Sequence, residues 1–440
     1  MRIARAAAFA TLLAFPVQDA AASGFQIREQ SASKLGNAFA GAGSSGDDAS
    51  ILFYNPAGIA LFDAPQAQAA VSPISPQIEF SGSATDATGG PVSRGDGGDA
   101  GSPVAVPSAY LVATISDRVN LGLALNVPFG LVTSYDDDWV GRYHAITSEL
   151  QTVSITGVAS LKISDRLSIG GGPVVTYAQS RLTNAIDFGS VCVGTIGLGP
   201  CSSFGALPQQ ADGKIDLQGS DWGMGATAGL LYEPVKGTRI GLSWRSQVRL
   251  KVEGDADFDV PANAAILTSG GAFTDSPGSA EVTLPETIGL SVHHDITDTV
   301  AVMGDVVWTG WSRFDELRFV FDNPAQPDAV TPQNWNDTIF VALGATWRPT
   351  DAWTLRTGVA YDQSPTEQNF RTPRMPDNDR YWVSLGADYR IDPRWTVSAG
   401  YTHIFVESSR MDHSEAAAGT LRGSYEGSID VLTLGATLRF

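Results

Sequence analysis

The last twelve residues of the chain, Ile429 to Phe440, alternate between apolar and small or polar side chains and end on an aromatic ring. Successive side chains of a β-strand point to opposite sides, so this alternation predicts a strand with two unlike faces. One face carries Leu432, Leu434, Ala436, Leu438 and Phe440, and the other carries Thr433, Gly435, Thr437 and Arg439. An apolar face backed by a polar one suits a strand with lipid outside and a wet or filled lumen inside.

The same alternation recurs along the chain. It is clearest at Val119 to Asn126, Ile339 to Arg348, Tyr381 to Ile391 and Trp395 to Thr402. Aromatic residues stand at the ends of these apolar faces, where the girdles of a membrane barrel meet the two interfaces. The pattern therefore predicts a wall of membrane-crossing strands.

The connections between the predicted strands alternate between short and long. The short turns are 116–118, 164–166, 233–237, 295–298, 349–351 and 391–393, and the long polar segments are 81–103, 129–144, 184–213, 254–278, 321–333, 362–377 and 407–423. Short periplasmic turns and long outer loops are typical of outer-membrane barrels, whereas a soluble sandwich has connections of similar length at both ends. We therefore predict an all-β fold, an antiparallel transmembrane β-barrel of about fourteen strands over residues 66–440.

The first residues predict export. A basic start, a short apolar run and Ala20 to Ala22 before Ser23 have the form of a signal peptide over residues 1–22. No later stretch approaches the roughly 20 continuous apolar residues that a membrane helix needs. The predicted location is the outer membrane of a Gram-negative cell, crossed many times by strands.

Residues 23–65 do not alternate and form a separate predicted domain. Gly41 to Gly46 matches G-x-G-x-x-G, but no strand precedes it and no βαβ unit surrounds it, so we expect no dinucleotide. The apolar stretch from Ile51 to Phe62 needs a core that so short a segment cannot build alone. We therefore expect a hatch, meaning a plug inside the barrel.

Net charge, cysteine content and the motifs present limit the functions that this chain can have. A net charge of −19 argues against nucleic acid, which requires a basic surface. Cys192 and Cys201, the two cysteines, lie close together and are expected to form a disulfide that closes one loop. The sequence predicts no metal site and no cofactor, and because G-x-S-x-G is absent we do not expect an enzyme.

The chain resembles the outer-membrane long-chain fatty acid transporters, the FadL family. In the hatch the likeness lies in residues 23–26, 36–41, 47–49 and 55–57, and downstream in residues 221–223, 244–248, 284–286, 311–314, 340–353, 356–365 and 376–382. The resemblance implies a monomeric barrel of fourteen strands with a hatch, and passive transport of hydrophobic molecules. The implied partners are a long-chain fatty acid or a comparable hydrophobe, outer-membrane lipid and lipopolysaccharide.

The resemblance also implies a route. In that family a hydrophobe is caught among the outer loops, enters a lumen pocket, and leaves sideways where the third strand is kinked. Pro128 lacks a ladder donor, so it either breaks the wall here or simply ends the strand. The implied gating residues are Asn55, Pro56, Ala57, Pro128 and Gly130.

The resemblance also implies which residues contact the substrate, by matching the family's pocket residues to positions in this sequence. Phe25 matches a hatch phenylalanine beside the family's pocket, Phe129 and Leu131 follow the expected break, and Arg318 matches a basic residue that can pair with a carboxylate. A second basic position falls on Asn184, with Arg181 nearby. This departure leaves room for neutral aromatic or aliphatic hydrocarbons as substrates. A general porin is the remaining alternative, and the hatch argues against it.

Overall fold

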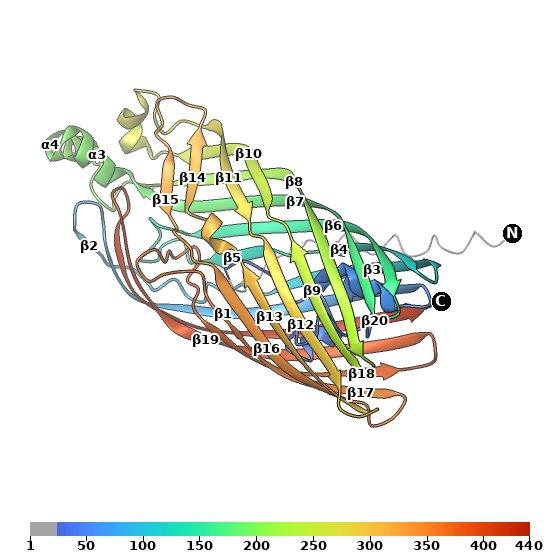
Figure 1. Ribbon diagram of the computed structural model, residues 1–440. Helices are drawn as coiled ribbons and strands as arrows, with labels where there is room; N and C mark the ends of the chain where they lie inside the picture. The colour runs from blue at the N-terminus through green and yellow to red at the C-terminus, as the bar shows by residue number, and fades with distance from the viewer. Residues whose placement is uncertain (1–23) are drawn as a thin grey trace.

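The computed structural model describes residues 24–440, so the expected signal peptide lies outside the described residues. The chain forms a closed antiparallel β-barrel of fourteen wall strands, as predicted (Figure 1). The long connections gather at the end opposite the C-terminus, called the outer end below. None of the helices within residues 24–440 has the length and hydropathy to cross a membrane.

Twenty strand segments build this sheet. They are β1 (Gln66–Thr85), β2 (Pro91–Val92), β3 (Val104–Ser116), β4 (Val119–Asn126), β5 (Gly130–Ser134), β6 (Thr147–Ser164), β7 (Leu167–Asp187), β8 (Asp212–Val235), β9 (Thr238–Arg245), β10 (Val248–Asp259), β11 (Ser276–Leu284), β12 (Thr287–Asp295), β13 (Val300–Thr309), β14 (Glu316–Phe321), β15 (Ala329–Pro332), β16 (Thr338–Trp347), β17 (Trp353–Asp362), β18 (Arg380–Arg390), β19 (Trp395–Glu415) and β20 (Gly419–Arg439).

Several wall strands consist of two segments in line, and the third wall strand is β4 followed by β5. The barrel closes where β1 pairs with β20, from Gln66 opposite Arg439 to Thr85 opposite Thr420. Every neighbouring pair of strands in the wall is antiparallel, and the pairing of β1 with β20 closes the ring.

The helices are short. In the hatch they are α1 (Ala32–Leu35), α2 (Ile51–Tyr54) and η1 (Pro56–Leu61), and in the connections they are α3 (Phe188–Ile196), α4 (Leu198–Phe204), η2 (Ala262–Thr268) and η3 (Trp311–Arg313).

The predicted alternation is confirmed on β20. Thr433 is buried, whereas Leu432 and Leu434 are 44% and 49% exposed on the outer wall. Outward rings pair at both ends of the wall. Tyr361 lies 5.5 Å from Tyr381 toward the outer end, and Trp353 lies 4.8 Å from Tyr389 toward the other. These positions suit two interfacial girdles.

The long outer connection expected at residues 407–423 is mostly strand. β19 continues to Glu415 and β20 begins at Gly419, so a three-residue turn joins two long strands. Above the membrane both faces of a strand can be polar, and the apolar alternation that marks a wall strand is then lost. The backbone pairing between these strands continues past a bulge at Val406 to Ser409.

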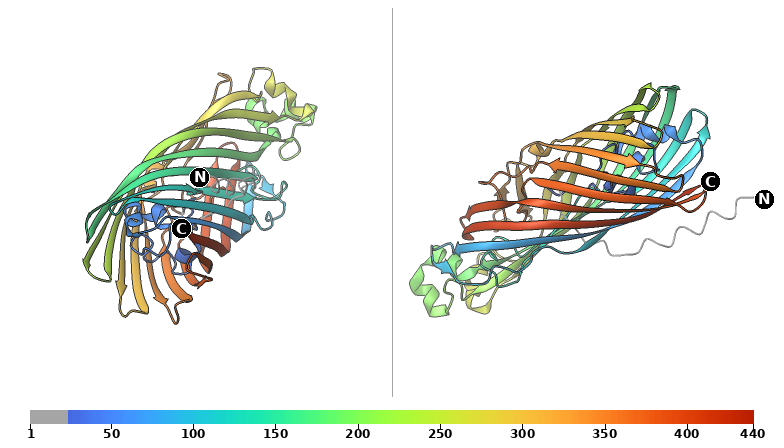
Figure 2. Two further views of the ribbon diagram at one scale, coloured as in Figure 1. Left: turned by 90° about the vertical axis from the view of Figure 1, so that its right-hand side faces the viewer. Right: turned by 90° about the horizontal axis from the view of Figure 1, so that it is seen from below.

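The hatch lies inside the ring of strands, as the left view of Figure 2 shows for the blue segment. It contacts the wall where the inward residue is glycine. A Cβ added at Gly358 would lie 2.2 Å from the backbone of Asn37, and one at Gly400 would lie 2.5 Å from the carbonyl oxygen of Ala32. Close packing of this kind needs glycine at those wall positions.

Candidate functional site

The third wall strand is interrupted between β4 and β5. Asn126 pairs with Ser154 of β6, and pairing resumes at Gly130 with Gln151, so three residues of the third strand stand opposite two of β6. Pro128 lies within the interruption and has no N–H for the ladder. The strand does not end here. It is displaced and continues.

Hatch residues take the place of a neighbouring strand at this interruption. The amide of Ile27 donates to the carbonyl of Pro128 at 2.9 Å, and the amide of Gly130 donates to the carbonyl of Phe25 at 2.9 Å. Gln26 and Phe129 form an isolated antiparallel bridge. The displaced segment thereby keeps its backbone groups paired inside the barrel.

A gap in strand pairing adjoins the interruption. β3 pairs with β4 as far as Ala109 opposite Leu125, while residues 104–108 of β3 pair only with β1. The hatch fills this gap, since Ser108 Oγ and Tyr110 Oη each donate to the carbonyl of Gln30 at 2.9 Å. Hatch contacts therefore replace direct strand pairing in this part of the wall.

Phe25 lies at the centre of an aromatic cluster. Its ring centroid is 4.6 Å from Trp311, 5.6 Å from Trp335, 5.8 Å from Phe314 and 6.1 Å from Phe129. The side chain is 3% exposed. Edge-to-face contacts of this kind are each favourable by about 0.5–1.5 kcal/mol beyond area burial, so the cluster holds Phe25 firmly in place.

An apolar pocket of about 70 Å³ lies beside this cluster. The apolar side chains that line it are Phe25, Leu131, Leu150, Leu182, Val282, Phe314, Leu317, Trp335 and Met375. Two of the predicted substrate residues, Phe25 and Leu131, therefore lie together, and Phe129 packs in the same apolar cluster. The space is small compared with the roughly 300–1,000 Å³ of most ligand pockets, so a long chain requires side chains to move.

The basic group at this pocket is Arg374, which the sequence analysis did not identify. It comes from the connection between β17 and β18, and its Nη2 donates to Asn184 Oδ1 at 2.9 Å. Burial lowers the pKa of Arg374 to about 10, so the side chain remains charged at neutral pH. In the part of the chain that the structure describes, no carboxylate lies within ion-pair distance of Arg374.

The two arginines expected at the pocket face outward. Arg181 shares the outer face of β7 with Tyr177, and its Nη2 lies 2.5 Å from Asp216 Oδ2. Arg318 on β14 is paired with Glu316 at 2.6 Å and with Asp328 at 3.0 Å. Neither lines the pocket, because the inward residue of β14 is Leu317. Sequence spacing does not indicate Arg374, which reaches the site through a loop.

The remaining expected gating residues belong to the hatch and do not line the pocket. Asn55 Nδ2 donates to the carbonyls of Gly43 and Leu230, and Asn55 Oδ1 accepts from the amide of Ala57 at 3.1 Å. Pro56 begins η1 directly after this cap. The triplet fixes how the hatch docks on β8, rather than contacting the displaced third strand.

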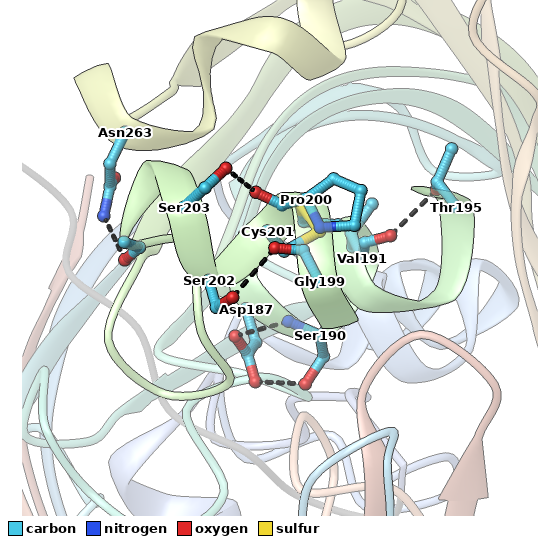
Figure 3. The surroundings of a disulfide bond; sticks show 12 residues. Asp187, Ser190, Val191, Thr195, Gly199, Pro200, Cys201, Ser202, Ser203 and Asn263 are labelled. Atoms are coloured by element: carbon cyan, nitrogen blue, oxygen red, sulfur yellow. Dashed lines mark hydrogen bonds between the residues drawn. A yellow bond between two sulfur atoms is a disulfide. The ribbon is translucent and has the colours of Figure 1, made fainter. Parts of the chain in front are cut away.

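Cys192 and Cys201 form a disulfide that joins α3 and α4 at the outer end (Figure 3). Both cysteines are fully buried. Asp187 caps α3 by accepting from the amide of Ser190 at 3.0 Å, and Asn263 of η2 donates to the carbonyl of Gly205 at 2.9 Å. The bond therefore lies within a small helical extension beyond the strands (Figure 1).

Comparison with known proteins agrees with this architecture. Residues 13–440 match the family model described as outer membrane protein transport protein (OMPP1/FadL/TodX). The long-chain fatty acid transport protein of Salmonella typhi is 31% identical over 413 residues, 92% of this chain and 89% of the relative.

Two solved structures have the same fold. The crystal structure of a Pseudomonas aeruginosa FadL homologue superposes with a TM-score of 0.88 at 26% identity, covering 94% of this chain and 99% of the homologue. The P. putida toluene transporter TodX has a TM-score of 0.68 at 17% identity, with 92% and 98% of the chains covered, and supports the fold alone. The chain therefore belongs to the outer membrane protein transport family (OMPP1/FadL/TodX), whose members carry hydrophobic molecules across the outer membrane and are not enzymes.

Proposed function

We propose that this protein imports long-chain fatty acids, taking the carboxylate at Arg374 and the chain in the apolar pocket beside Phe25. The observation that carries the proposal is a charged guanidinium with no carboxylate within ion-pair distance among the described residues, at the edge of a mostly apolar pocket whose polar lining includes Glu149. A guanidinium binds a carboxylate through charge-assisted, often bidentate hydrogen bonds. A neutral hydrocarbon gains nothing from such a group.

The hydrophobic part of the substrate supplies the remaining affinity. Each methylene removed from water contributes about 0.8 kcal/mol, so a long acyl chain gains most of its binding from the pocket walls. Phe25 and Leu131 contact this space from the hatch and from β5. Movement of the hatch is then the means by which the pocket enlarges for a full chain.

Release is proposed to be sideways, between residues 104–108 of β3 and the displaced third strand. Support comes from the pairing there, since this part of β3 lacks a strand partner on that side and contacts the hatch instead. An apolar molecule leaving by this route enters outer-membrane lipid directly, which avoids transfer through water. Passage beside lipopolysaccharide requires no other protein, and we propose that a monomer suffices.

The name of the Salmonella typhi relative agrees with a fatty acid as substrate, and the toluene transporter with the same fold defines the competing substrate class. The test compares oleate and toluene uptake in cells that depend on this protein. Arg374→Met should slow oleate uptake at least tenfold and leave toluene uptake unchanged. The matched control is Arg318→Met, which removes an outward arginine and should change neither rate.

Equal oleate uptake by the Arg374→Met and unaltered proteins, at equal amounts in the outer membrane, would remove the fatty-acid assignment. Rapid toluene uptake in the same cells would then favour a neutral hydrocarbon as the substrate. High ion conductance of the unaltered protein in planar bilayers would instead favour the porin alternative.

A further inference from the structure

Two histidines and a glutamate meet at the outer end, and none of the three lines the substrate pocket. His144 belongs to the connection between β5 and β6, while His413 and Glu415 lie on the outer extension of β19. One ligand atom from each of the three side chains lies within 4.8 Å of the other two. Residues far apart in the sequence are thus brought together by the closing of the loop over the barrel.

The His144 ring has no other evident role in the fold. It is 5% exposed, and neither ring nitrogen has a hydrogen-bond partner among the described residues. A buried polar group left unpaired costs about 1–3 kcal/mol, so such a group in a folded protein calls for an explanation. Its ring centroid lies 5.3 Å from that of His413, which places His144 directly against the other two side chains.

His413 and Glu415 are already oriented toward each other. His413 Nε2 lies 2.9 Å from Glu415 Oε1, and Thr331 Oγ1 donates to the same carboxylate oxygen at 3.4 Å. A cation bound between the ring and the carboxylate takes the place of the shared proton, and the threonine helps to orient the carboxylate.

We propose that His144, His413 and Glu415 bind a divalent transition-metal ion of the zinc type. Two imidazoles and one carboxylate form a donor set that suits zinc, whereas calcium and magnesium prefer oxygen ligands alone. Tetrahedral zinc ligands about 2.0–2.2 Å from the ion lie about 3.3–3.6 Å from one another. Atoms up to 4.8 Å apart must therefore close by about 1.2–1.5 Å, and the 2.9 Å pair of His413 and Glu415 must open slightly. The three side chains leave the fourth coordination position of the ion free for a water molecule or another ligand.

The Arg374 guanidinium is close enough to act electrostatically on His144 and Glu415, but it is hydrogen-bonded to other groups. Its nitrogens donate to the carbonyls of Thr147 and Thr183, to Ser148 Oγ and to Asn184 Oδ1. The positive charge of Arg374 repels a bound metal ion and so weakens its binding, and the negative charge of Glu415 offsets that repulsion.

Occupancy of this site would tie residues 135–146 to β19. That connection directly follows β5, the outer half of the displaced third strand, and packs against β19 and β20 through Tyr135, Trp139 and Tyr425. A bound ion therefore stiffens the connection over residues 135–146, which continues from the strand next to the proposed exit.

The test uses the full-length protein, purified in detergent and stripped of metal with a chelator. Zinc alone is titrated by calorimetry, and Co²⁺ is used as a coloured substitute whose absorption reports tetrahedral coordination. We expect one zinc bound per chain with micromolar affinity. His144→Ala and His413→Ala should each weaken binding at least tenfold.

The matched control is His294→Ala, which removes an exposed histidine bonded to Thr238 and should leave zinc binding unchanged. Folding of each variant is checked by its heat-modifiable mobility in gels, and His413→Gln provides a milder change. Absence of zinc binding to the unaltered protein would overturn the proposal. Undiminished binding by the folded His144→Ala/His413→Ala double variant would also overturn it.

Discussion

The side-chain amide of Gln30 bonds both backbone groups of Val127. Gln30 Nε2 donates to the Val127 carbonyl at 2.7 Å, and the Val127 amide donates to Gln30 Oε1 at 3.2 Å. One hatch side chain thereby replaces the two ladder bonds that a neighbouring strand would otherwise supply. The break in the wall and the hatch are parts of one arrangement.

Gln30→Ala should loosen this arrangement. The variant leaves both Val127 groups without their partner, at a cost of about 1–3 kcal/mol for each buried group that stays unpaired. Hydrogen exchange at the amides of Ile27 and Gly130 should accelerate. Gln179→Ala, an exposed position on β7, is the control and should leave these amides as protected as before. Unchanged exchange in Gln30→Ala would show that the hatch holds the break by other contacts.

Gly229→Val should displace the hatch from the wall. A Cβ at Gly229 would lie 2.0 Å from Asn55 Oδ1, so any side chain there collides with the cap of η1. We expect a several-fold rise in single-channel conductance in planar bilayers as the plug loosens. Gly157→Val serves as the control, because a Cβ at Gly157 meets nothing within 4 Å. Equal conductance of the two variants would argue against docking of the hatch through this contact.

Asp47 should anchor the hatch electrostatically. Its Oδ2 lies 3.3 Å from Arg356 Nη1 and 3.5 Å from Lys34 Nζ. Burial opposes ionisation, but these cations outweigh it and hold the pKa of Asp47 well below its ordinary value of 3.8. A carboxyl whose pKa is depressed on folding stabilises the protein above its unfolded pKa, and this contribution is lost as the pH falls through the folded pKa.

The part of the hatch protection that depends on Asp47 should therefore be unchanged from neutral pH down to about 4 and be lost at lower pH. Asp47→Asn should reduce that protection at pH 7 already, by up to about 3 kcal/mol. Asp63→Asn is the control, because the Asp63 side chain is 91% exposed and its pair with Lys162 is a surface contact. A hatch equally protected at pH 7 in both variants would assign no anchoring role to Asp47.

Removal of the disulfide should affect the outer helices and spare the barrel. Replacing both Cys192 and Cys201 by serine removes a constraint that is worth about 2–3 kcal/mol for a loop of this length. Proteolysis within residues 188–205 should accelerate severalfold, with unchanged heat stability of the barrel in gel mobility assays. Free thiols in the unreduced, denatured natural protein would contradict the bond itself.

The sequence by itself determined the barrel, because alternation of apolar and polar residues is a local property that can be recognised strand by strand. Val119 to Asn126 and Trp395 to Thr402 lie in strands as predicted. Pro128 marked the position of the break, since a residue without an N–H disturbs any ladder.

Only the tertiary structure decided which side chains meet at the sites. Arg318 alternates like any strand residue, and its outward direction follows from the phase in which β14 resumes after η3. Arg374 reaches Asn184 through a loop, and His144 reaches His413 from the connection between β5 and β6. Such contacts depend on loop paths and strand phase, which no local periodicity encodes. They form only when distant segments pack together.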